Sequence, residues 1–151
     1  MRRNIISALT LISMVIGVST LALAETAAED AVKYRQNIMK ALSGHGGAVA
    51  LIASGKAGVA GNMGKHVGSL ADLVAEVAAA FEQNATSEDS EALPKVWTDP
   101  EGFADAVAEL ESASATLSAA AGSGDAKAIE AAVKDFRQSC RDCHDDYRKD
   151  D

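Results

Sequence analysis

Five residues near the C-terminal end constrain the fold of this 151-residue chain more than any other stretch: Cys140-Arg141-Asp142-Cys143-His144. They contain the only two cysteines of the sequence, with a histidine directly after the second. This Cys-x-x-Cys-His pattern is typical of c-type haem attachment. Two thiols one helical turn apart can each add to a vinyl group on one porphyrin edge, and the adjacent imidazole can then ligate the iron. We therefore predict one covalently bound haem c, attached through Cys140 and Cys143, with His144 as the proximal ligand.

The same cysteine pair has other interpretations, which the rest of the sequence supports less well. A thioredoxin-like enzyme carries Cys-x-x-Cys beside a βαβ unit, but nothing in this sequence alternates as a strand does. A structural zinc site needs four ligands, and there is no second Cys-x-x-Cys. A disulfide between Cys140 and Cys143 would close a tiny loop and add little stability. A thiol–disulfide enzyme stays a rival hypothesis, which predicts a colourless protein with a reactive thiol.

Apolar residues at three- and four-residue spacings predict that the motif lies on a helix. In this last segment the stripe contains both cysteines and four further residues: Ile129, Val133, Phe136 and Tyr147. Similar stripes predict three earlier helices, at about residues 26–54, 60–83 and 100–121, with a long irregular connection over residues 84–100. Helices joined by mostly short connections indicate an all-α, antiparallel four-helix bundle with the haem among its helices.

Capping residues predict where the last two helices begin and end. Asp99 is expected as the N-cap of the third helix, with Pro100 in its first turn. The run Gly122-Ser123-Gly124 is expected to end that helix, and Asp125 to cap the fourth. These signals place the third and fourth helices next to each other across a very short turn.

The first helix has an interruption that leaves two outcomes open. Gly44, Gly46 and Gly47 lie in its middle, and each glycine costs about 1 kcal/mol relative to alanine in a helix interior. The segment is therefore predicted either as one long helix weakened in the middle or as two pieces.

The N-terminus has the composition of a secretory signal peptide. Met1-Arg2-Arg3 is followed by an apolar stretch and by Ala22-Leu23-Ala24 directly before Glu25. We predict residues 1–24 as a cleaved signal peptide and residues 25–151 as the cytochrome domain. A retained membrane anchor is the alternative, but small polar residues dilute the apolar stretch. Haem is attached to Cys-x-x-Cys-His outside the cytoplasm in bacteria, so we predict a periplasmic protein without a membrane span after cleavage.

The charge of the chain limits its partners. The formal net charge is −8 at pH 7, which argues against a nucleic-acid partner. A basic redox partner protein would suit this acidity, although acidity alone often serves only solubility.

We predict no enzyme activity, because no paired carboxylates or nucleophile–base arrangement supports a hydrolase.

Three stretches of the sequence resemble class II c-type cytochromes, the cytochrome c′ group. The run from Cys140 through Arg148 is similar to the C-terminal end of that family, Tyr34-Arg35-Gln36-Asn37-Ile38-Met39 to its first helix, and residues 97–117 to its third. The resemblance covers residues 25–151. It implies that Arg35 and Gln36 lie near the haem propionates and that Met39 lies over the distal face. An arginine can bind a carboxylate through two parallel hydrogen bonds, whereas a solvated helix charge is the alternative for Arg35.

The resemblance leaves the role of Met39 as the central question. High-spin members of the family keep the iron five-coordinate and bind small gases, whereas low-spin members use this methionine as a sixth ligand and carry electrons. The run Gly-His-Gly-Gly at residues 44–47 resembles the low-spin members. We therefore predict a monohaem electron carrier with His144/Met39 ligation that serves redox partner proteins. The alternative is a five-coordinate cytochrome c′ that binds nitric oxide or carbon monoxide.

Three further side chains are rival iron ligands. His45 and His66 are expected in solvated positions, and Met63 is expected in the core rather than at the iron.

The resemblance implies dimers among the five-coordinate relatives, so the chain is predicted as a monomer or a homodimer.

Overall fold

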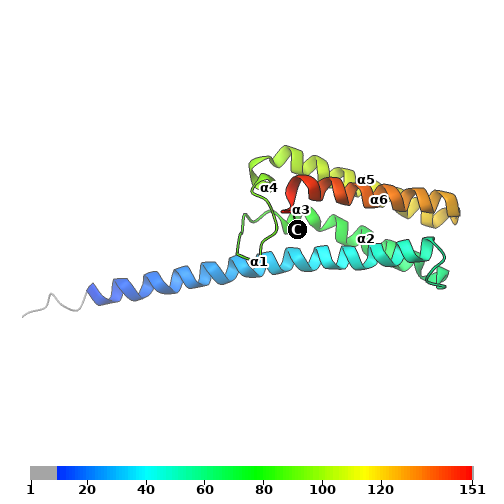
Figure 1. Ribbon diagram of the computed structural model, residues 1–151. Helices are drawn as coiled ribbons and strands as arrows, with labels where there is room; N and C mark the ends of the chain where they lie inside the picture. The colour runs from blue at the N-terminus through cyan, green and yellow to red at the C-terminus, as the bar shows by residue number, and fades with distance from the viewer. Residues whose placement is uncertain (1–9, 151) are drawn as a thin grey trace, which may run out of the picture.

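The computed structural model of the protein describes residues 10–150, and for residues 10–24 and 26 it describes the backbone alone. The helices follow one another as α1 (Thr10–Ala53), η1 (Ala60–Asn62), α2 (Met63–Ala75), α3 (Val77–Ala80), α4 (Lys95–Thr98), α5 (Pro100–Ser123) and α6 (Ala126–Tyr147). Figure 1 shows α1 beside α2, and α5 beside α6, as two helix pairs that pack into one bundle. Residues 10–150 form no β-strand. The predicted all-α four-helix bundle is confirmed.

The expected signal peptide is only partly within the described residues. Its first nine residues lie outside them, and the segment from Thr10 to Ala24 forms the first turns of α1. In the part of the chain that the structure describes, no helix combines the length and the apolar character needed to cross a membrane. The boundary after Ala24 stays a prediction.

The glycines of α1 do not break the helix. The helix continues from Thr10 to Ala53, so the one-helix alternative is correct. Leu42 and Val49, one on each side of the glycines, are both buried in the core. Tertiary packing of this face outweighs the low helix propensity of glycine, because most helix stability in proteins comes from packing.

The predicted capping residues of α5 and α6 are confirmed, both at the start of α5 and at the turn between the two helices. The Asp99 carboxylate accepts a hydrogen bond from the Gly102 backbone N–H at 3.2 Å, and Pro100 is the first residue of α5. Gly124 ends α5 with a φ of 71°, a left-handed conformation that glycine adopts without steric cost. Asp125 then accepts bonds from the N–H groups of Lys127 at 2.8 Å and Ala128 at 3.1 Å. One glycine and one carboxylate thus reverse the chain.

The predicted second helix and the connection after it differ from the structure. The segment from residue 60 to 83 is divided into η1, α2 and α3, with a break at Glu76. Val74 and Val77, on either side of the break, are both 2% exposed, so the break keeps both in the core. The predicted irregular connection contains α4, which Pro94 precedes as its N-cap residue. Proline is tolerated at the start of a helix, so Pro94 does not exclude α4. A four-residue helix is too short to show a periodic pattern, which is why the sequence did not predict it.

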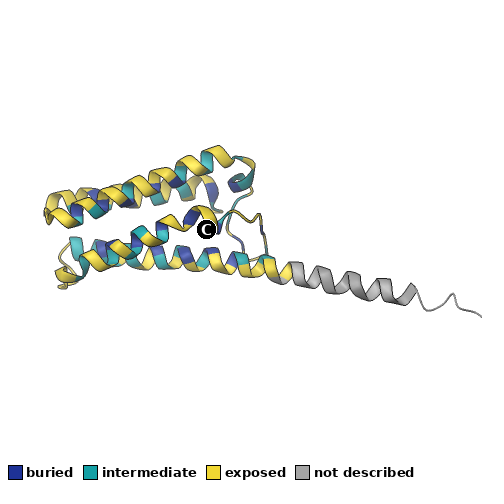
Figure 2. Ribbon diagram, turned by 180° about the vertical axis from the view of Figure 1, so that it is seen from behind, coloured by how far each residue is buried: buried dark blue, intermediate teal, exposed yellow. Residues whose placement is uncertain are grey.

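The core is one hydrophobic cluster between the four long helices, seen as dark blue residues on their inward faces in Figure 2. Leu70 has no exposed surface, and Leu117 and Val49 are each 1% exposed. Members of the predicted stripe on α6, including Phe136, Ile129, Val133 and Cys140, belong to this cluster or pack against it. The motif therefore begins inside the core.

Candidate functional site

The motif helix α6 and the first helix α1 pack side by side. Cys140 of α6 and Met39 of α1 are both half-buried against the same hydrophobic cluster, which contains Leu42 and Phe136. A Cβ atom added to Gly46 of α1 would lie 3.8 Å from the Phe136 ring, which is ordinary contact. The first helix therefore faces the motif helix, as predicted.

The two thiols lie in an environment that keeps them protonated. Burial raises the pKa of Cys143 to about 11, and the negative charges of Cys140 and Asp146 add to the effect. Burial also raises the pKa of Cys140, although the nearby Arg141 partly opposes this. Redox enzymes of the Cys-x-x-Cys type depend on a lowered thiol pKa, because the thiolate is the nucleophile. The surroundings of these thiols therefore argue against the thiol–disulfide hypothesis.

His144 lies one residue beyond the second cysteine, on the exposed side of the last turn of α6. Its carbonyl accepts a hydrogen bond from the Arg148 backbone N–H at 3.0 Å. Partial desolvation, and next the positive charge of Arg148, lower the pKa of His144. Both effects favour the neutral imidazole, which is the form that binds a metal ion.

Arg35 is the most unusual side chain of the site, because it is charged and only 4% exposed. Its guanidinium carbon lies 5.3 Å from the centre of the Phe81 ring and 5.2 Å from that of the Trp97 ring. Its Nη2 atom donates to the Ala85 carbonyl, and its Nε atom donates to the Ala31 carbonyl at 3.3 Å. The alternative of a solvated helix charge is therefore wrong for Arg35.

One nitrogen of this guanidinium lacks an acceptor. The Nη1 atom of Arg35 is buried and has no hydrogen-bond partner among the described residues. Burial accordingly lowers the pKa of Arg35, because an unpaired buried cation is costly. A carboxylate next to Nη1 would supply both the missing acceptor and the missing negative charge. The residues of this site therefore fit a haem, whose propionates are such carboxylates.

Gln36 has a partner on the loop that connects α3 to α4. Its Nε2 atom donates to the Asp89 carbonyl at 2.8 Å. The same loop binds the C-terminal tail, since Lys149 Nζ donates to the Ser90 carbonyl at 2.6 Å and the Lys149 N–H donates to the Glu91 carbonyl at 2.8 Å. The loop therefore ties α1 to the residues that follow α6. The predicted contact of Gln36 with a propionate stays a prediction, because the amide is engaged with the loop.

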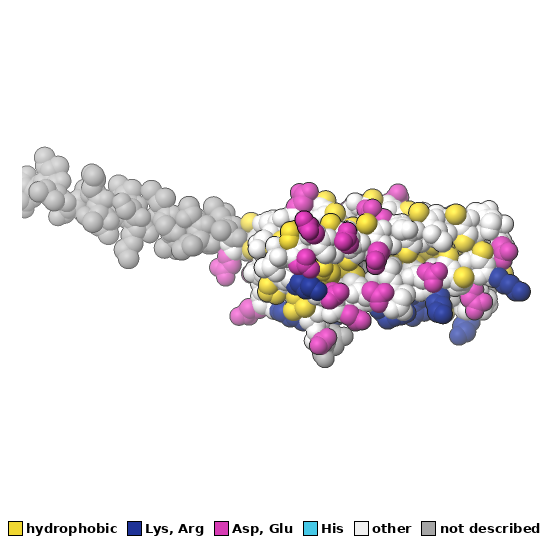
Figure 3. Space-filling model, turned by 90° about the horizontal axis from the view of Figure 1, so that it is seen from above, with side chains coloured by type: hydrophobic (Ala, Val, Ile, Leu, Met, Phe, Trp, Pro, Cys, Tyr) yellow, Lys and Arg dark blue, Asp and Glu magenta, His cyan; other side chains and the backbone are white. Residues whose placement is uncertain are grey.

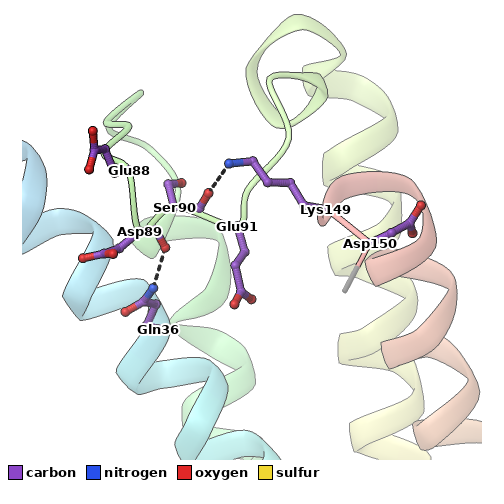
Figure 4. A pocket seen from close by; sticks show the side chains of 7 residues that line it. All are labelled: Gln36, Glu88, Asp89, Ser90, Glu91, Lys149 and Asp150. Carbon is purple, nitrogen blue, oxygen red and sulfur yellow. Dashed lines mark hydrogen bonds between the residues drawn. The ribbon is translucent and has the colours of Figure 1, made fainter.

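A groove of about 530 Å³ opens between this loop, α1 and the C-terminal tail. Figure 4 shows the side chains that line it: Gln36, Glu88, Asp89, Ser90, Glu91, Lys149 and Asp150. Four of these seven side chains are acidic, so the groove would repel a negatively charged ligand.

The residues that contact Arg35 could not be predicted from the sequence. Phe81, Ala85 and Trp97 contact Arg35 from positions 46, 50 and 62 residues further along the chain, and no spacing rule brings such distant residues together. The single tryptophan of the chain was the one available hint, because its large ring and N–H usually find specific partners. Here the Trp97 Nε1 atom donates to the Phe81 carbonyl at 2.8 Å.

The rival ligands lie in other settings. His45 and His66 are half-buried and bind each other, with their Nδ1 atoms 3.0 Å apart, so the expected solvated positions are wrong for both. Met63 is half-buried against the hydrophobic cluster, as expected for core packing.

The helix that faces the motif carries Met39, packed against the hydrophobic cluster, and Arg35, whose Nη1 donor has no acceptor among the described residues. Together with the Cys-x-x-Cys-His motif, these features are those of a c-type cytochrome with a helical-bundle fold.

Comparisons with known proteins identify the family. The family model described as Cytochrome C′ matches residues 30–148, and the chain belongs to the cytochrome c′ family. A cytochrome c′ of Alcaligenes xylosoxydans xylosoxydans is 36% identical over 122 residues, which are 80% of this chain and 94% of that protein. A cytochrome c-554 of Cereibacter sphaeroides is 35% identical over 94 residues, covering 62% of this chain and 70% of that protein.

Solved structures agree with this assignment. A ferrous variant of cytochrome c prime from Alcaligenes xylosoxidans with bound nitric oxide superposes with a TM-score of 0.76 at 34% identity. A carbon monoxide-bound variant of the same protein gives a TM-score of 0.75 at 35% identity. Each comparison covers 82% of this chain and 97% of the other. The chain is therefore a c-type cytochrome with one covalent haem c, and its only two cysteines are available for the attachment.

Proposed function

We propose that this protein is a periplasmic cytochrome c′ that binds nitric oxide or carbon monoxide, with Met39 covering the ligand-binding face. The observation that carries the proposal is the similarity to solved cytochrome c prime structures with bound nitric oxide and with bound carbon monoxide. The packing of Met39 is compatible with it, because this residue is half-buried against an apolar cluster on the helix that faces the motif.

The residues of the site have distinct tasks in this proposal. The Cys140 and Cys143 thiols hold the haem covalently, and the His144 imidazole is the proximal ligand. Arg35 directs its free Nη1 toward a propionate, and Gln36 lies one residue further along the same helix. When bound, the haem supplies an iron atom with one coordination position left for a gas.

Met39 selects what reaches that position. Its neighbours in the cluster, among them Ile38, Leu42 and Phe136, are apolar, so a charged ligand would lose hydration there without gaining hydrogen bonds. An uncharged diatomic molecule loses little hydration free energy on entering such an apolar environment. Methionine has a flexible, unbranched side chain, which can move aside for such a small ligand.

An electron carrier with His144/Met39 ligation is the second candidate. It is compatible with the same placement of Met39, because a thioether on the helix that faces the motif is also a soft ligand for haem iron. The comparisons favour the gas-binding alternative over the electron carrier that we predicted from the sequence.

The proposed location and partners follow from the N-terminus and the charge. Residues 1–24 have the composition of a signal peptide, which would lead the protein to the periplasm. On the face shown in Figure 3, acidic side chains are spread over the bundle, whereas most Lys and Arg side chains lie along one edge. A redox partner that reduces the haem would therefore be basic, and the protein would act as a monomer or a homodimer.

The absorption spectrum of the haem-loaded protein tests the proposal. Spectra are recorded in the oxidised and reduced states, with and without carbon monoxide, for the natural protein and for Met39→Ala. We expect a high-spin reduced spectrum that shifts when the gas is added, and a faster shift in Met39→Ala because the cover is smaller. A low-spin reduced spectrum that ignores carbon monoxide, and that becomes sensitive to it in Met39→Ala, would instead establish the electron carrier.

A further inference from the structure

A pair of histidines connects α1 and α2. His45 of α1 and His66 of α2 are both half-buried, and their Nδ1 atoms lie 3.0 Å apart. Their ring centres are 5.2 Å apart and the rings are tilted by 55°. The third histidine of the sequence is His144, so the haem motif does not account for this pair.

We propose that His45 and His66 form a binding site for a divalent transition-metal ion such as Zn²⁺. Imidazole nitrogen is a common ligand for zinc, copper and nickel. The two Nδ1 atoms come from two helices and already lie 3.0 Å apart, so the pair could act as a bidentate ligand. This inference is independent of the proposed gas binding.

The distance between the two nitrogens suits this role. Two zinc–nitrogen bonds of about 2.0–2.1 Å at a tetrahedral angle place the nitrogens about 3.4 Å apart. The observed 3.0 Å lies within a few tenths of an ångström of that value, which a small rotation of either ring supplies.

The proton balance is simple. A hydrogen bond between two Nδ1 atoms needs a proton on one of them, which donates, and a lone pair on the other, which accepts. For a metal ion to bind, the donor ring changes tautomer and carries its proton on Nε2, so that both Nδ1 lone pairs are available. No proton is gained or lost in this change.

The surroundings leave room for the rest of the coordination shell. Gly44 lies next to His45, and Gly64 lies two residues before His66; both are exposed. A Cβ atom added to either glycine would meet nothing within 4 Å, so the helix surface next to each histidine is open at these positions. Within residues 10–150 no third histidine, cysteine or carboxylate completes a group of three. Water would therefore fill the remaining positions, and the acidic chain, with a net charge of −8, favours cations near its surface.

Titration calorimetry with ZnCl₂ on the haem-loaded protein tests the site. We expect one zinc ion per chain, and a loss of affinity of more than about tenfold in both His45→Ala and His66→Ala, because even indirect partners of a ligand contribute about 10- to 100-fold. Lys65→Ala is the matched control, since Lys65 is exposed, adjacent to His66 and not an imidazole. Zinc should also raise the Tm of the natural protein and leave that of the two histidine variants unchanged.

Two results would overturn the proposal. One is the absence of a one-to-one binding curve in the natural protein, and the other is a curve that both histidine substitutions leave intact. If an alanine variant fails to fold, His45→Gln and His66→Gln replace it, because glutamine can keep a hydrogen bond across the helix pair but lacks the imidazole. Retained zinc affinity in both glutamine variants would show that the pair is a hydrogen bond only.

Discussion

At one end of the bundle the α5–α6 turn satisfies its own backbone, whereas at the other end a buried guanidinium nitrogen has no acceptor among the residues that the structure describes. In the turn, Gly124 takes the left-handed conformation and Asp125 binds the first N–H groups of α6. At the motif end, Arg35 is enclosed by Phe81 and Trp97 while its Nη1 atom stays unpaired. Native proteins pair almost all of their buried polar groups. Ser114 Oγ is also buried without a partner among the described residues, but it carries no charge. The unpaired nitrogen of a buried cation is the costlier exception, and it points to the end of the bundle where a ligand would complete the structure.

The two ends also differ in how they depend on distant residues. The turn uses neighbours in the sequence, so its stability is local. The motif end joins α1, the loop of residues 82–94 and the tail after α6, through Ala85, Glu91 and Lys149. A change at the motif end should thus affect the haem, whereas a change at the turn should affect stability alone.

The largest expected effect comes from removing the thiols. Cys140→Ala combined with Cys143→Ala should abolish covalent haem, because no other cysteine exists in the chain. Haem staining of a denaturing gel measures this directly. Ser139→Ala, next to the motif, should keep the full signal. A haem band that survives in the double variant would contradict the assignment of the attachment site.

Arg35 should give the next largest effect. Arg35→Met keeps most of the packing volume but leaves the propionate that we assign to Nη1 buried without a partner, and breaking a buried ion pair costs about 3–5 kcal/mol. Guanidinium chloride unfolding of the haem-loaded protein measures the change in the free energy of unfolding.

Lys33→Met is the control for that experiment, two residues earlier on the same helix. The Lys33 side chain is 63% exposed, and its contacts with Glu29 and Asp30 are 3.9 and 4.0 Å long. Such exposed pairs contribute at most about 1 kcal/mol. Equal losses in Arg35→Met and Lys33→Met would mean that Arg35 holds no carboxylate.

Alanine substitutions at two glycines of α5, one near each end of the helix, should change the stability of the protein by smaller amounts and in opposite directions. A Cβ atom at Gly102 would lie 2.5 Å from Asp99 Oδ2 and 2.7 Å from the Tyr147 hydroxyl, so Gly102→Ala must displace the N-cap. We expect a loss of about 1–3 kcal/mol, as for other overpacked sites. A Cβ atom at Gly122 meets nothing within 4 Å, so Gly122→Ala should stabilise by about 0.4–1 kcal/mol. Thermal unfolding of both variants measures the difference, and the same sign in both would contradict it.

The same contrast explains what could be predicted from the sequence. The α5–α6 turn was predictable, because Gly124 and Asp125 act on residues within one helical turn. The break at Glu76 was not, since it depends on how Val74 and Val77 fit a core that other helices complete. The short helix α4 was not, because four residues are too few to show a periodic pattern.

The candidate site divides in the same way. The motif and its helix follow from short-range spacing, and α6 carries the motif where the pattern places it. The role of Met39 was implied by the family resemblance, and the structure shows this residue packed against the core cluster. The family resemblance implied that Arg35 lies near a propionate, but its aromatic enclosure depends on Phe81 and Trp97. The pairing of His45 with His66 likewise depends on the register between α1 and α2, which periodicity alone does not determine.

The smallest expected effect concerns the ion pair between the loop and the tail. Arg148 Nε lies 2.8 Å from Glu91 Oε2, but the two side chains are 36% and 57% exposed. A double-mutant cycle with Glu91→Gln and Arg148→Gln isolates the coupling of this pair from the other contacts of Arg148. We expect a coupling of about 0.2–1 kcal/mol at low salt, and close to none in 1 M salt, where the screening length is about 3 Å.

The same four proteins of that cycle also reveal whether the pair acts on the haem. Because Arg148 lies four residues after His144 and its backbone N–H binds the His144 carbonyl, a shift of the tail would reach the residue that we propose as the proximal ligand. If the ion pair only fastens the loop, the visible spectrum of Glu91→Gln should match that of the natural protein while the free energy of unfolding falls slightly. A spectral change in Glu91→Gln without loss of stability would instead place Glu91 among the residues that position His144, and would extend the motif end of the bundle to the loop.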